Sequence, residues 1–186
     1  SLQSTVSKLK GADVNLDPIV LLTGPQSAGK SMLAMMSVQT DDAIQLFPHG
    51  VTWLNFGELW RQEFTRKKRQ EKLLRILLRE VQIICEVVPS DVRVETNSMY
   101  NAEECKALIR MLVHHHSLRL LLVLDDVDSV EDVAEFAYLG MIVLVTSKFK
   151  FPQHDQKTID IDPFLTDADL MDLKTDYGVV LGLSLI

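Results

Sequence analysis

Gly24-Pro25-Gln26-Ser27-Ala28-Gly29-Lys30-Ser31 fits the phosphate-binding loop pattern G-x-x-x-x-G-K-[ST] at every fixed position. In such a loop, backbone N–H groups surround the phosphates, the lysine contacts the outer phosphates, and the final hydroxyl binds Mg²⁺. The sequence therefore predicts a phosphate site made of these eight residues and of Met32, which follows them.

The segments on either side of the loop have the character that this pattern requires. Residues 18–23 form a short apolar run typical of a buried strand, and residues 31–38 indicate a helix whose N-terminus points at the phosphates. The alternative is a glycine-containing turn that binds nothing. The complete octapeptide in this context makes that the weaker interpretation.

The rest of the chain alternates between apolar strand patterns and helical patterns. We expect helices at 1–10, 58–88 and 102–115, and further strands at 51–56, 118–124, 141–146 and 158–161. Strands that read as continuous apolar runs between helices indicate an α/β fold, with a parallel sheet covered by helices on both faces.

Two acidic residues end the apolar run at 118–124. Asp125 is expected to hold Mg²⁺ beside Ser31, and Asp126 is the candidate catalytic residue that orients an attacking water. A helix cap or a solvated turn is the alternative, and the presence of the phosphate loop makes it less favoured.

Thr146-Ser147-Lys148 follows the next apolar strand and is expected beside the same crevice. A hydroxyl and a cation there are suited to sensing a terminal phosphate. Spacing alone favours the alternative, a strand end whose polar residues reach solvent.

Composition and charge exclude several classes of function. The net charge of −7 argues against a general nucleic-acid binder, and no apolar run approaches the ~20 residues that cross a bilayer. The basic run Arg66-Lys67-Lys68-Arg69 is expected on a solvated helix face. We expect a cytoplasmic protein, and because the chain opens on Ser1, part of a longer one.

Four segments occur in a characteristic order along the chain: Gly24–Ser31, Phe47–Gly57, Leu120–Val127 and Ile142–Lys148. In this order and approximate spacing they resemble the NB-ARC nucleotide-binding domain of the STAND class of signalling ATPases. Within that family, the Phe47–Gly57 segment looks most like the apoptotic protease-activating factors that build apoptosomes.

The resemblance implies a P-loop NTPase with a five-stranded parallel sheet in the order 5-1-4-3-2. It implies a nucleotide-binding domain over 1–165 and, at 166–186, part of the following helical subdomain. The implied activity is a switch that binds ADP, ATP or dATP with Mg²⁺ and hydrolyses slowly at most. It implies a homo-oligomer, assembled through this domain, that recruits an effector protease through domains outside the chain.

Residue roles carried over from the family are specific. The resemblance implies that Lys30 is the phosphate-binding lysine and that Ser31 and Asp125 bind Mg²⁺. It also implies that Asp126 stands in place of the family's glutamate base and that Lys148 stands where the family has a sensor arginine. Ser27 replaces a loop glycine, which we expect to be tolerated only at negative φ. Pro25 removes one backbone donor, and Lys148 loses the bidentate geometry of arginine.

Two other functions stay open. The first is a degenerate P-loop domain that serves only as a protein-interaction scaffold. The second is a P-loop ATPase or small-molecule kinase that turns over rapidly. A GTPase is the weakest interpretation, because the sequence contains no N-K-x-D guanine motif.

Overall fold

The computed structural model describes residues 2–57, 65–85, 100–151 and 158–161. They build a five-stranded sheet in the order β2-β3-β4-β1-β5 in which every neighbouring pair is parallel. This confirms the predicted strand order, with β4 between the strand that precedes the phosphate loop and the strand that ends in the acidic pair. The strands are β1 Ile19–Thr23, β2 Val51–Asn55, β3 Leu121–Asp125, β4 Ile142–Ser147 and β5 Thr158–Asp160.

The sheet is buried on both faces, since its central strands β1, β3 and β4 are buried at every position and mostly apolar. Along β3, Leu122 and Leu124 belong to the larger hydrophobic cluster, whereas Leu121 and Val123 belong to the smaller one. Successive side chains of a strand point to opposite faces, so β3 contributes side chains to both hydrophobic clusters. The same double burial explains why the sequence shows continuous apolar runs rather than alternation.

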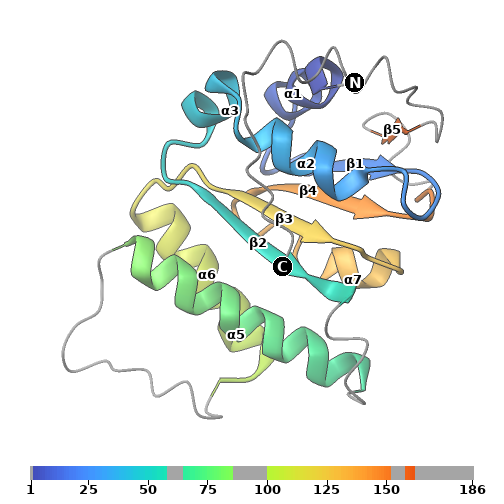
Figure 1. Ribbon diagram of the computed structural model, residues 1–186. Helices are drawn as coiled ribbons and strands as arrows, with labels where there is room; N and C mark the ends of the chain where they lie inside the picture. The colour runs from blue at the N-terminus through green and yellow to red at the C-terminus, as the bar shows by residue number, and fades with distance from the viewer. Residues whose placement is uncertain (1, 58–64, 86–99, 152–157, 162–186) are drawn as a thin grey trace, which may run out of the picture.

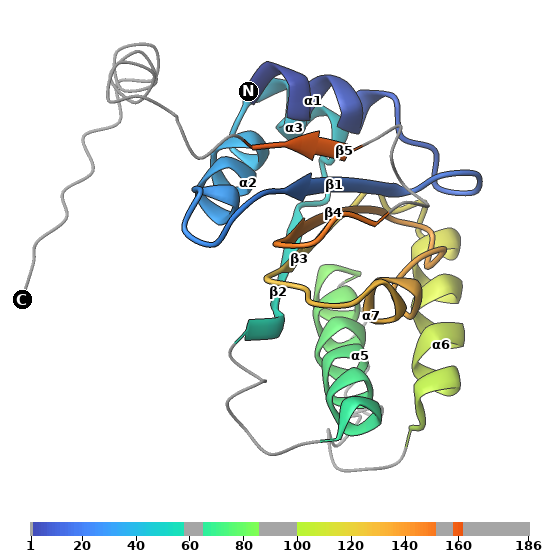
Figure 2. The ribbon, with the colours of Figure 1, turned by 90° about the vertical axis from the view of Figure 1, so that its right-hand side faces the viewer.

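Helices cover both faces, as predicted, and Figures 1 and 2 show the two layers. On one face lie α1, α2 and α3, and on the other α5, α6 and α7. The helices are α1 Leu2–Lys10, α2 Lys30–Val38, α3 Asp41–Leu46, α5 Arg66–Ile84, α6 Ala102–His115 and α7 Val130–Ala134.

The helix bounds agree with the sequence pattern where the helices are long. The α6 helix spans the predicted residues, because Asn101 and Glu104 form a capping box at its start. The predicted helix 58–88 is shorter in the structure, because Thr65 has an extended backbone and is the N-cap of α5, and Cys85 is its C-cap. Residues 58–64 and 86–88 lie outside the described residues, as does the segment expected to begin a helical subdomain at 166–186. The short helices α3 and α7 were not predicted, since so few residues hold no helical repeat of apolar positions.

The basic run at the start of α5 is exposed at three of its four positions, as the sequence suggested, and buried at the fourth. Arg69 is buried, and the Arg66 Nε donates to Asp132 on α7 at 2.8 Å. Gln70 donates to the same Asp132 oxygen at 2.9 Å. Because Asp132 is itself buried, these bonds tie α5 to α7, while Arg66, Lys67 and Lys68 all remain exposed.

Within the described ranges, no helix combines the length and the apolar character needed to cross a membrane.

Candidate functional site

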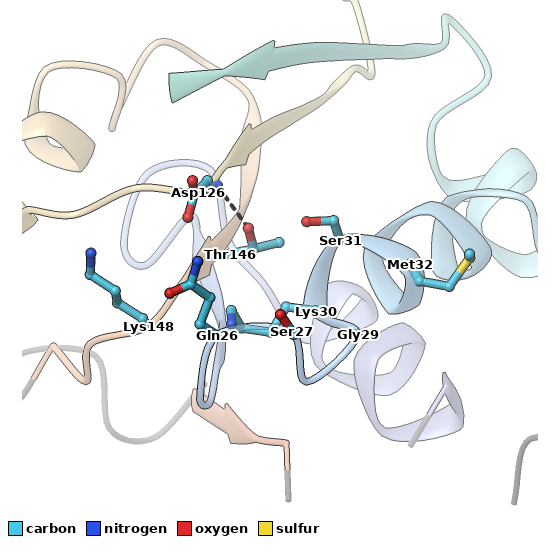
Figure 3. A pocket seen from close by; sticks show the side chains of 9 residues that line it. All are labelled: Gln26, Ser27, Gly29, Lys30, Ser31, Met32, Asp126, Thr146 and Lys148. Carbon is cyan, nitrogen blue, oxygen red and sulfur yellow. Dashed lines mark hydrogen bonds between the residues drawn. The ribbon is translucent and has the colours of Figure 1, made fainter. Parts of the chain in front are cut away.

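The phosphate loop, the acidic pair and Lys148 meet where β1, β3 and β4 end. The carboxyl ends of parallel strands share one edge of a sheet, where α/β proteins bind their ligands. A cavity of about 340 Å³ opens there, and Figure 3 shows the side chains around it. It is lined by Gln26, Ser27, Gly29, Lys30, Ser31, Met32, Asp126, Thr146 and Lys148.

Two glycines shape the loop for different reasons. Gly24 lies against the end of β5, where an added Cβ would come 2.6 Å from the backbone oxygen of Ile161. Gly29 is the N-cap of α2 with a φ of 81°, and no side chain caps this helix end. The first N–H groups of a helix have no intrahelical partner, so those of α2 remain donors for an anion.

Ser27 corrects one expectation from the sequence. Its φ is +64°, in the left-handed region, whereas we expected a serine to be accommodated here only at negative φ. The loop imposes the conformation that the family's glycine would adopt freely. A left-handed backbone costs a non-glycine residue roughly 1 kcal/mol, so the loop is strained at this position.

Lys30 contacts the loop that precedes it. Its Nζ donates to the backbone oxygens of Gly24 at 3.0 Å and Pro25 at 2.6 Å, and its side chain is largely buried. Burial lowers the pKa of Lys30, while the charges of Asp126 and Asp125 oppose that shift. Pro25 therefore supplies an acceptor for the lysine, although it lacks a donor for phosphate.

Asp125 joins the phosphate loop to β4. Its Oδ1 accepts from the Ser31 hydroxyl at 2.7 Å and from the Thr146 hydroxyl at 2.5 Å. A carboxylate beside a hydroxyl offers the oxygen ligands that Mg²⁺ takes, and Mg²⁺ in such sites also uses the phosphates of its substrate. Among the residues that the structure describes, no cluster of three His, Cys, Asp or Glu could hold a metal by itself. The donor set thus fits an ion that arrives with a phosphate ligand.

Asp126 has a left-handed backbone with a φ of 58°. Its N–H donates to the Thr146 hydroxyl oxygen at 2.9 Å, the dashed line in Figure 3. Gly57, after β2, leaves room for its side chain, because an added Cβ there would lie 2.5 Å from the Asp126 Oδ2. These two contacts fix Asp126 at the edge of the cavity.

The position of Thr146 changes the role expected for its hydroxyl. The sequence left two roles open for this group, sensing a terminal phosphate and, as the favoured alternative, reaching solvent. The side chain is instead buried, its proton is donated to Asp125 and its oxygen accepts from Asp126. Thr146 therefore joins the Asp125 carboxylate to the Asp126 backbone. Of the three residues Thr146, Ser147 and Lys148 at the end of β4, Lys148 is the one that presents a charge to the cavity.

Lys148 lines the cavity opposite α2 and forms an ion pair with Asp128 at 2.9 Å. Its close contact with Asp128, and then the charge of that carboxylate, raise the pKa of Lys148. The three carboxylates of Asp125, Asp126 and Asp128 outnumber the two ammonium groups of Lys30 and Lys148. The site alone carries a net charge of −1, which opposes a bare polyphosphate.

The structure brings together most of the residues that the sequence predicted. Eight of the twelve line the cavity, Asp125 accepts a hydrogen bond from Ser31, Gly24 and Pro25 accept from Lys30, and Ala28 packs against the smaller core cluster. Sequence reasoning missed the contributions of Asp128 and Gly57. The third acid after the β3 run was a signal for Asp128, but none indicated that Gly57 lies against Asp126.

Comparisons with known proteins support the fold. No protein-family model matches the sequence, and no curated protein matches it significantly. The crystal structure of Cdc6p from Pyrobaculum aerophilum superposes with a TM-score of 0.56 at 15% identity, over 94% of this chain and 47% of that one. The chain thus spans about half the length of Cdc6p.

Two further structures are similar with TM-scores below 0.5, so the comparison with Cdc6p carries the fold assignment. A STAND protein with a tetratricopeptide repeat sensor from Pyrococcus horikoshii gives 0.49 at 14% identity, over 93% of this chain and 27% of that one. The Aeropyrum pernix ORC2 protein, in ADPNP and ADP complexes, gives 0.48 at 12% identity, over 86% and 45%. The sheet order, the loop and the match to Cdc6p together give this chain the α/β fold of the P-loop NTPases.

Proposed function

We propose that the cavity binds the phosphates of an adenine nucleotide, ADP, ATP or dATP, together with Mg²⁺. The observation that carries this proposal is the direct contact between the Ser31 hydroxyl and the Asp125 carboxylate beside a cavity that Lys30 and Lys148 also line. The preference for adenine rests on the NB-ARC resemblance and on the missing guanine motif.

Each group has a distinct role in this proposal. The N–H groups of the loop and of the uncapped α2 N-terminus bind the inner phosphates, and Lys30 contacts the outer ones. Ser31 and Asp125 hold Mg²⁺, which neutralises phosphate charge when it is bound. Lys148 approaches the terminal phosphate from β4.

Asp126 is the proposed catalytic residue, acting on a water molecule rather than on the nucleotide. Its exposed carboxylate lines the cavity, and the bond from its N–H to Thr146 fixes the backbone that carries it. Aspartate is shorter than the glutamate that it replaces in the family. We therefore expect slow hydrolysis, with nucleotide retained as a switch.

The NB-ARC resemblance extends the proposal to assembly. We propose that residues 1–165 form the nucleotide-binding domain, that nucleotide state controls self-association through it, and that the complete protein recruits an effector protease to an apoptosome-like platform. Light scattering of the chain with ADP and with a non-hydrolysable ATP analogue tests whether nucleotide state controls self-association. A mass that is the same with both nucleotides would contradict assembly through this domain alone.

A protein-interaction scaffold without nucleotide is the second candidate, and two observations favour it. The strain at Ser27 and the contacts of Lys30 with its own loop would both persist in a loop that no longer binds phosphate.

Calorimetric titration with Mg²⁺-ADP and Mg²⁺-ATP separates the candidates. We expect micromolar binding or tighter, and loss of about 100-fold or more in Lys30→Ala. Lys150→Ala is the matched control, because Lys150 is an exposed lysine that pairs with Asp160 outside the cavity. A wild-type chain that binds neither nucleotide would support the scaffold, whereas hydrolysis at ~1 s⁻¹ or faster would indicate a turning-over enzyme.

A further inference from the structure

The contact between Lys148 and Asp128 couples a cation in the cavity to an acid outside its lining. Lys148 is 44% exposed and carries its charge on a flexible stem, whereas Asp128 is 32% exposed. The Lys148 side chain is therefore free to move, provided that it leaves Asp128.

Asp128 is held more firmly than its partner. The neighbouring Val127 N–H donates to the backbone oxygen of Thr146 at 2.9 Å, which fixes this segment beside the end of β4. The Asp128 Oδ1 is shielded from solvent and has no well-directed hydrogen bond within the described residues. The Lys148 ammonium at 2.9 Å is thus the charge that compensates this oxygen.

A terminal phosphate would compete with Asp128 for the same ammonium group. The loop, Lys30 and Ser31 lie on the α2 side of the cavity, where the inner phosphates of either nucleotide would bind. Only a triphosphate carries a further phosphate that can reach toward Lys148, and binding it there weakens the ion pair with Asp128. A diphosphate leaves that pair intact.

We propose that Asp128 is a specificity-determining residue that favours the diphosphate by holding Lys148 away from the terminal phosphate. The proposal rests on the nucleotide-binding function argued above. It assigns to Asp128 an action through Lys148, with no contact to the nucleotide. An exposed ion pair has a modest strength, so the effect on the preference is a few-fold.

The test compares affinities for Mg²⁺-ADP and for the Mg²⁺ complex of a β,γ-imido ATP analogue, measured by calorimetry. In Asp128→Asn we expect affinity for the triphosphate to rise about fivefold and affinity for ADP to change by less than about twofold. Asp160→Asn is the matched control, because it removes an ion-paired aspartate near the same edge of the sheet without touching Lys148. It should leave the ratio of the two affinities unchanged.

The Asp128→Asn substitution in a Lys148→Met variant shows whether Lys148 is responsible for the change in triphosphate affinity. In Lys148→Met, adding Asp128→Asn should change triphosphate affinity by less than about twofold, because no cation remains to be released. A fivefold gain that persists without Lys148, or an equal gain for ADP, would overturn the proposal while leaving nucleotide binding intact. A wild-type chain that binds neither nucleotide would instead overturn the proposed function, and this inference with it.

Discussion

The two loops that meet at the cavity are held in opposite ways. The phosphate loop has a left-handed Ser27, a left-handed Gly29 and an α2 N-terminus without a side-chain cap. The segment after β3 is bound to its surroundings through Thr146 and Lys148, and α7 is bound to α5. The acidic side of the cavity, the segment after β3, is thus pre-organised by its own contacts. The phosphate loop on the other side keeps N–H donors available for a ligand.

Asp125→Asn should separate metal-dependent from metal-independent binding. The amide keeps the shape but removes the charge that attracts Mg²⁺, so we expect ADP affinity in Mg²⁺ to fall by about tenfold or more. In EDTA the variant should bind at least as tightly as wild type, because one carboxylate no longer repels the phosphates. Titrations in the two buffers check this. A loss of the same size in both would mean that Asp125 has only a structural role.

Thr146→Val should destabilise the segment that carries Asp125 and Asp126. The substitution leaves the Asp126 N–H and the Asp125 carboxylate without the hydroxyl that joins them, at a cost of about 1–3 kcal/mol in the free energy of unfolding. Thr146→Ser is the control, since it keeps the hydroxyl and loses only a buried methyl group. Urea unfolding and ADP titration should show lower affinity for the valine variant alone. Equal affinities would contradict the positioning role.

Much of this architecture could be predicted from the sequence, because it depends on local patterns. The octapeptide, the apolar strands and the acids after 118–124 were sufficient for a parallel α/β sheet and for placing Asp125 beside Ser31, whereas the strand order was implied by the NB-ARC resemblance. The φ of Ser27 and the bond from Arg66 to Asp132 depend on how distant segments pack, so no local pattern indicated them. Neither role considered for the Thr146 hydroxyl, sensing a phosphate or reaching solvent, is the one observed, because its sequence position does not show which neighbour receives its proton.

Ser27 allows the strain of the phosphate loop to be measured. At a positive φ, glycine is favoured over alanine, so Ser27→Gly should be more stable than Ser27→Ala by roughly 1 kcal/mol. Both variants lose the hydroxyl, and each is therefore the control for the other. Thermal or urea unfolding measures the difference. An alanine variant as stable as the glycine variant would show that this φ carries no strain.

Substitution of Glu131 is expected to have the smallest effect, a change in how the free energy of unfolding depends on pH in acid. The Ser129 hydroxyl, its own backbone N–H and Arg66 lower the pKa of Glu131 to about 2 from 4.5. A lowered pKa in the folded state means that this contribution to stability is present above about pH 4.5 and disappears as the pH falls toward 2. The stability difference between wild type and Glu131→Gln should therefore shrink over that range.

Urea unfolding at several pH values measures this change. Glu80→Gln, which removes an exposed charge from α5, is the control. If the difference between wild type and Glu131→Gln were the same at pH 7 and pH 3, the contacts of Glu131 with Ser129 and Arg66 would not stabilise the fold.

The most direct test of the central claim is the nucleotide carried by the purified wild-type chain. The chain is denatured, and the released material is separated and quantified by chromatography, with Lys30→Ala treated in parallel. We expect up to one adenine nucleotide per wild-type chain, mainly ADP, and none from the variant. A wild-type chain that carries no nucleotide and binds neither ADP nor ATP at ~1 mM with Mg²⁺ would contradict a nucleotide-binding site at this edge of the sheet.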